Sequence, residues 1–102
     1  MSDILLTGTV GADGRAVITL RADAKQKWQV QQVSPEMASA PASAVGNVRR
    51  NGALVAPFSP SGDAVGGEPY PTLGLGDTLT VEWANCVPGA SCSANFFYEV
   101  LP

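Results

Sequence analysis

Two cysteines are the residues of this chain whose type and spacing most directly suggest chemistry. Cys86 and Cys92 are the only cysteines, and five residues that include a Pro-Gly pair separate them. They could form a disulfide, bind a metal, supply a catalytic thiol or remain free. Because the chain has no histidine, a catalytic thiol would lack its usual base. Zinc needs about four nitrogen or sulfur ligands, so the open alternatives are a disulfide and two free thiols.

The strands expected around the cysteines bear on that choice. If residues 79–83 and 96–100 form a hairpin with Trp83 opposite Phe96, the two sulfurs start on opposite faces of the sheet. A bond between the two sulfurs requires the pairing of the two strands to shift by one residue, which turns the apolar side chains of a whole strand to the other face. A disulfide across this short loop adds about 2 kcal/mol, whereas burying each aromatic contributes about 2–3 kcal/mol. The comparison favours free thiols and leaves the disulfide possible.

Carboxylates offer a second kind of chemistry. Asp63 and Glu68 lie in a stretch rich in glycine and proline, and a carboxylate pair can hydrolyse glycosides or help to bind calcium. The same residues are typical of solvated turns, which is the stronger interpretation. Without histidine there is no Ser-His-Asp arrangement, and no Gly-Lys-Ser/Thr phosphate loop occurs. We therefore predict no enzymatic activity, no cofactor and no metal.

Tyr70 is the aromatic side chain best placed to contact a partner. It stands between two prolines in the stretch 59–74, which is long for a connection without regular structure. Connections of this length are often functional or packed into an interface. Tyr70, Asp63 and Glu68 are therefore the candidate partner contacts, and a mobile surface loop is the alternative.

Length and charge restrict the classes of partner. The 102 residues, 45% hydrophobic and 15% charged with a net charge of −3, predict one globular domain over residues 1–102. The six basic residues are dispersed, so nucleic acid is not an expected partner. No apolar run reaches the roughly 20 residues of a membrane span, and the first residues do not resemble a signal peptide. The low charge suits either a protein interface or an ordinary neutral surface.

Short β-branched and apolar runs separated by turn residues predict an all-β fold. Asn51-Gly52 favours a type I′ turn and therefore a hairpin, and a Gly-containing bend after residue 10 predicts another. Pro35 is expected to end a strand, and Pro57 to lie at a sheet edge. Six or seven strands then form an antiparallel β-sandwich, jelly-roll-like in arrangement. The expected strands are residues 3–10, 15–21, 27–34, 44–50, 53–58, 78–83 and 94–100.

The order of these features resembles a known class of protein. The segments are GTVGADGRAVITL, KWQVQQV, AVGNVRRNGALV, a Gly-rich loop, LGLGDTLTVEW and PGASCSANFFYEV. They are similar to small β-sandwich virion structural proteins of actinobacterial tailed phages, over nearly the whole chain and in strand pattern and turns.

This resemblance implies a virion component made in the host bacterial cytoplasm. Its implied role is that of a capsid decoration or minor capsid protein. Such a protein binds the major capsid protein lattice as a homo-oligomer, with a trimer favoured. In this chain, residues 59–74 and 1–6 are the candidate contacts with that lattice. The alternative is a tail- or fibre-associated module that binds host-surface glycan through Tyr70.

Overall fold

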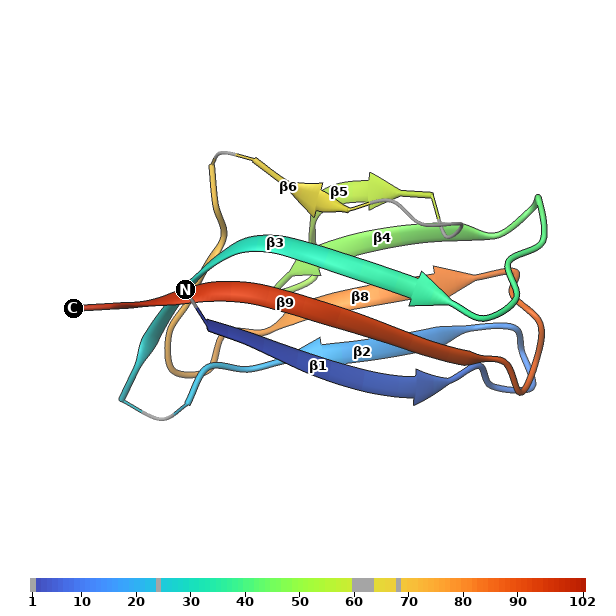
Figure 1. Ribbon diagram of the computed structural model, residues 1–102, viewed down its shortest axis with the longest axis horizontal. Helices are drawn as coiled ribbons and strands as arrows, with labels where there is room; N and C mark the ends of the chain where they lie inside the picture. The colour runs from blue at the N-terminus through green and yellow to red at the C-terminus, as the bar shows by residue number, and fades with distance from the viewer. Residues whose placement is uncertain (1, 24, 60–63, 68) are drawn as a thin grey trace.

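Two antiparallel sheets pack face to face in the computed structural model (Figure 1), which describes residues 2–23, 25–59, 64–67 and 69–102. One sheet has the order β1 (Ser2–Thr9), β9 (Ser91–Leu101), β3 (Lys27–Met37), β6 (Val65–Gly66), and β7 (Thr72–Leu73) also pairs with β3. The other has the order β2 (Ala16–Leu20), β8 (Leu79–Ala84), β4 (Val45–Arg50), β5 (Ala53–Phe58). The predicted β-sandwich is confirmed, and the described residues form nine strands instead of six or seven. Within the described ranges there is no helix, so none that could cross a membrane.

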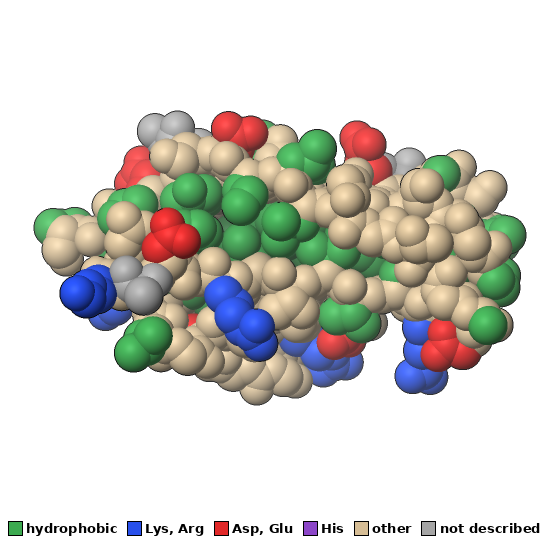
Figure 2. Space-filling model, turned by 90° about the horizontal axis from the view of Figure 1, so that it is seen from below, with side chains coloured by type: hydrophobic (Ala, Val, Ile, Leu, Met, Phe, Trp, Pro, Cys, Tyr) green, Lys and Arg blue, Asp and Glu red, His purple; other side chains and the backbone are tan. Residues whose placement is uncertain are grey.

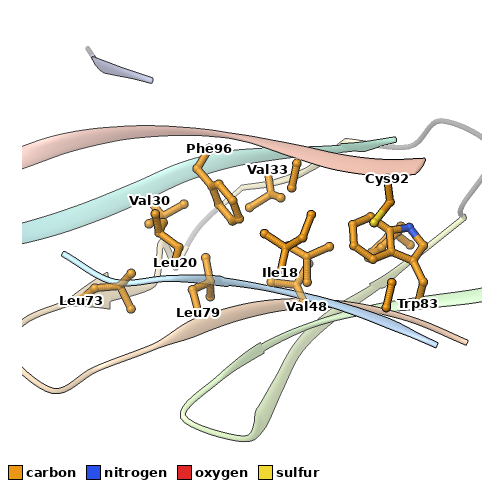
Figure 3. Close-up of a cluster of buried hydrophobic side chains, with 14 of the residues drawn as sticks. Ile18, Leu20, Val30, Val33, Val48, Leu73, Leu79, Trp83, Cys92 and Phe96 are labelled. Atoms are coloured by element: carbon orange, nitrogen blue, oxygen red, sulfur yellow. The ribbon is translucent and has the colours of Figure 1, made fainter. Parts of the chain in front are cut away.

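The core lies between the sheets and is built from alternating side chains of each strand. In β2 and β8 every second residue is buried, ending in β8 with Trp83. From the opposite sheet Trp28, Val30 and Phe96 point inward to meet them, and Figure 3 shows several of these side chains interdigitated. Trp28 and Trp83 are 3% and 2% exposed, so both indole rings lie in the core.

The predicted hairpin between residues 3–10 and 15–21 is wrong. Its two strands, β1 and β2, lie in different sheets, where β1 pairs with β9 and β2 pairs with β8. The connection is therefore an arch that crosses between the sheets. It is hydrogen-bonded to the connection between β8 and β9, which also crosses between the sheets: Val10 N donates to Ala90 O at 2.9 Å and Cys86 N donates to Gly14 O at 3.0 Å. Two arches that satisfy each other's backbone groups replace two separate turns.

The predicted final hairpin is wrong for the same reason. Strands β8 and β9 belong to opposite sheets, so Trp83 pairs with Ala16 and Gly46, while Phe96 pairs with Ile4 and Val33. Both aromatics still face the core, each from its own sheet. The one-residue register conflict that favoured free thiols in a hairpin therefore does not arise.

Strand β3 continues further than the sequence predicts. Pro35 does not end it, because Pro35 pairs with Ala94 and the ladder with β9 runs on to Met37. A bulge shifts the ladder between Val30 and Gln32. Strict alternation along the strand would put Val33 on the face opposite to Val30, but beyond the bulge Val33 is buried on the same face as Val30, at 3% exposure. An extra residue in one strand resets the alternation beyond it.

The predicted hairpin around Asn51 and Gly52 is confirmed. Both residues have positive φ, 50° and 85°, as a type I′ turn requires. The return strand β5 pairs with β4 and, among the described strands, forms the edge of its sheet, so Pro57 lies at an edge as predicted.

Candidate functional site

A groove of about 500 Å³ opens on the side of the sandwich where β5 and β6 lie (Figure 1). One wall is β5 and the inner face of β4, and the other is the middle of β3 with the chain that follows β6. The described lining residues are Val30–Val33, Val48, Arg50, Leu54–Ala56, Val65–Gly67, Pro69–Thr72 and Leu79.

The second wall forms because residues 65–66 and 72–73 pair with β3, so the stretch 59–74 contains two short strands where the sequence predicts none. Strand β6 pairs with Gln32 and Val33, and β7 pairs with Trp28 and Gln29. Between these two contacts lies the bulge of β3 at residue 31. Tyr70, which lies between β6 and β7 in the chain, is among the residues that line the groove.

Arg50 ties the two walls together. Its Nε donates to the carbonyl oxygen of Thr72 at 2.8 Å, and its Nη2 lies 3.1 Å from Asp77 Oδ2. Thr72 belongs to β7 in one sheet, whereas Arg50 ends β4 in the other. A planar guanidinium can donate hydrogen bonds to a carbonyl and a carboxylate at once, so this side chain holds one end of the groove in place.

Asp77 organises the neighbouring turn through its two carboxylate oxygens. Gly74 N donates to Oδ2 and Asn51 Nδ2 donates to Oδ1, both at 2.9 Å. The backbone bond from Gly74, followed by the bond from Asn51 and the charge of Arg50, holds the pKa of Asp77 below its ordinary value of 3.8. Hydrogen bonds to the ionised form favour that form.

The lowered pKa of Asp77 predicts that the protein loses stability in acid. A carboxyl whose pKa is lowered by folding stabilises the folded state at pH values above its ordinary pKa, and this contribution disappears as the pH falls from 3.8 through the folded pKa. Urea unfolding of wild type and Asp77→Asn should therefore differ most near pH 7 and converge in acid. A constant difference from pH 7 to pH 2 would contradict this role for Asp77.

The chemistry of the groove suits binding. Its described lining includes no carboxylate and no cysteine, and its polar side chains are Gln31, Gln32, Arg50, Tyr70 and Thr72. Among the residues with described positions, no group of three or more His, Cys, Asp or Glu could hold a metal. Apolar walls with a few amide and hydroxyl groups are typical of ligand or peptide sites.

The structure places the predicted contact residues only in part. Tyr70 is half-buried and lines the groove, whereas Asp63 and Glu68 lie outside the described residues. Sequence reasoning missed Leu54 and Val55, which line the groove while 55% and 39% exposed. The available signal was a run of apolar residues in a strand that a proline assigns to an edge.

Cys86 and Cys92 lie away from the groove and are free thiols in the structure. Both are buried, and burial raises the pKa of each thiol above 9.0. Figure 3 shows the sulfur of Cys92 directed toward the indole of Trp83. A protonated thiol in apolar surroundings behaves as a small hydrophobic side chain.

We expect the native protein to resist alkylation at both thiols, because neither is exposed and both are protonated near neutral pH. Denaturation without reductant should release two reactive thiols, measured by mass after iodoacetamide treatment. If denatured, unreduced protein took up no label and had lost two hydrogens, the cysteines would form the disulfide left open by the sequence.

The chain matches no protein-family model, no curated protein and no solved structure.

Proposed function

We propose that this protein is a non-enzymatic virion component that binds the outer capsid lattice of a tailed phage and stabilises it. Many copies would act together, so weak individual contacts with the major capsid protein would add up over the particle. The proposal rests on the resemblance in strand order and turns together with the groove beside β5.

The observation that carries the proposal is the apolar character of that groove. Leu54 is 55% exposed at its rim, and Val55 lies beside it. The chain has only fifteen charged residues in 102, so few charges oppose burial of this surface. Exposed apolar residues beside a concave wall are typical of protein-binding sites.

Immunogold electron microscopy tests where the protein acts. Antibody to the purified protein is applied to the tailed particles produced in the source culture. Label spread over the heads is the expected result. Label confined to tails would contradict capsid binding and favour the tail-associated module described below. Particles without label would overturn both functions.

A paired substitution tests the groove. Leu54→Asp should weaken binding of the purified protein to phage heads that carry no antibody by about ten-fold or more, because a charge would be buried at the contact. Leu75→Asp is the matched control: Leu75 is 85% exposed and does not line the groove, so binding should be retained. Cosedimentation with heads gives both affinities, and equal losses would remove the groove from the proposal.

A tail-associated module that binds host-surface glycan is the second candidate. Tyr70 lines the groove together with the amide side chains of Gln31 and Gln32. An aromatic face for stacking and neighbouring amides for hydroxyl groups suit a sugar ring. Titration of host-wall polysaccharide should then show saturable binding that Tyr70→Ala removes.

A further inference from the structure

The described strands include five at sheet edges, and four of them are protected against pairing with another chain. Strands β6 and β7 are only two residues long, and β5 carries Pro57 and an extra residue at Val55. Strand β2 has five residues and is flanked by exposed Arg15 and Arg21. Short length, proline, bulges and charge are the usual means of keeping an edge from further pairing.

Strand β1 lacks these features. All eight of its residues pair with β9 in continuous register from Ser2 to Thr9, without a bulge. It contains no proline and no basic residue, and its one charge is Asp3 near the beginning. Leu5, in its middle, is 60% exposed on the outer face of the sheet. A long, regular, apolar edge with one free side is a template for another strand.

The side of the molecule at this edge is also apolar. Figure 2 shows the side where β1 and β2 lie, with hydrophobic side chains gathered in a strip along the molecule. Ile4 and Leu6 of β1 are half-buried and pack against the core from its rim. A strand added to β1 would bring side chains over this rim and cover it.

We infer that two copies of this chain pair through β1, antiparallel about a two-fold axis at Leu5, so that one sheet runs through both molecules. In this register Leu5 meets Leu5 of the second copy on the outer face, and Ile4 meets Leu6 over the apolar rim. Asp3 lies opposite Thr7, so the two carboxylates are kept apart. Cross-strand pairs of this kind stabilise a sheet, and a two-fold interface requires such self-complementarity.

The other candidate edge, β2, does not pair with itself in the same way. A two-fold axis at its central residue, Ile18, would place Arg15 opposite Arg21 of the second copy at both ends. Like charges directly opposite each other destabilise a strand pair. Charge therefore selects β1 over β2 as the strand that joins two copies.

The first test is the mass of the protein in solution. Sedimentation equilibrium over a range of concentrations should give twice the 10.5 kDa of one chain at the upper end. Leu5→Lys should weaken this association by about ten-fold or more, because two ammonium groups would lie opposite each other. Leu75→Lys, a change at another exposed leucine, should leave it unchanged.

Several results would overturn the inference. They are a monomer at every concentration, a trimer, a dimer that Leu5→Lys leaves intact, and a dimer that Leu75→Lys breaks equally. The experiment involves no capsid and no glycan, so a monomer would leave the proposed capsid binding to be decided by its own tests. A trimer would match the oligomer that the resemblance implies.

A cysteine pair tests the register and does not depend on the behaviour of Leu5→Lys. Leu5→Cys places two thiols at directly opposed positions, about 5 Å apart at Cβ, so mild oxidation should link the two copies covalently. Asp3→Cys is the control, because two copies of position 3 would be about 13 Å apart along the ladder. The wild type supplies a background, since Cys86 and Cys92 are buried. Linkage at position 3 instead of position 5 would refute the register.

Discussion

Phe96→Ala is expected to lower the free energy of unfolding by about 3–5 kcal/mol, the usual cost of removing a buried aromatic side chain. Phe96 is 0% exposed and points from the middle of β9 into the space between the sheets (Figure 3). A cavity left there has core side chains on every side and little room to collapse. Urea unfolding followed by tryptophan fluorescence measures the loss.

The neighbouring Phe97 provides the matched control for Phe96. It has the same side chain on the same strand but points to the outer face, where it is half-buried. Phe97→Ala should cost about 1 kcal/mol, as for a typical partly exposed site. Similar losses for the two variants would mean that β9 has a different register from the one described.

Gly46→Ala is the second change with a large expected effect. A Cβ at Gly46 would lie 2.8 Å from Cδ2 of Phe58 and closer still to Cε2 and Cζ. Phe58 is 7% exposed and meets Trp83 edge to face, with ring centroids 5.8 Å apart. Because the φ of Gly46 is not positive, the clash with the ring is the source of the cost. We expect a loss of about 2–3 kcal/mol, measured by urea unfolding.

Two further variants separate the clash from a general effect of replacing glycine. At Gly74 the nearest atom to a new Cβ is a carboxylate oxygen of Asp77 at 3.8 Å, so Gly74→Ala should cost under about 0.5 kcal/mol. Gly46→Ala combined with Phe58→Leu should cost less than the sum of the two single changes, because a smaller side chain relieves the contact. Strict additivity would contradict the clash.

The candidate site could be predicted from the sequence only in outline. Tyr70 was recognisable because two prolines hold it in a stretch too long for a simple turn, and it does line the groove. The other wall was recognisable only as an apolar strand at a sheet edge, because the segment that lies across from Leu54 and Val55 is set by the packing of β6 near β5. Nothing within residues 53–58 specifies what lies across from them.

The sequence by itself determined seven of the strands, the apolar face of those strands up to the bulge of β3, and where the hairpin at Asn51 and Gly52 turns. These properties are local, since alternation has a period of two and a type I′ turn depends on two residues. The tertiary structure alone decided that the connections after Val10 and before Cys92 are arches. Two successive strands bury their apolar faces equally well when they pair as a hairpin in one sheet and when an arch places them in opposite sheets. Contacts between residues far apart in the chain choose between the two arrangements, and they also create the groove and leave β1 as an open edge.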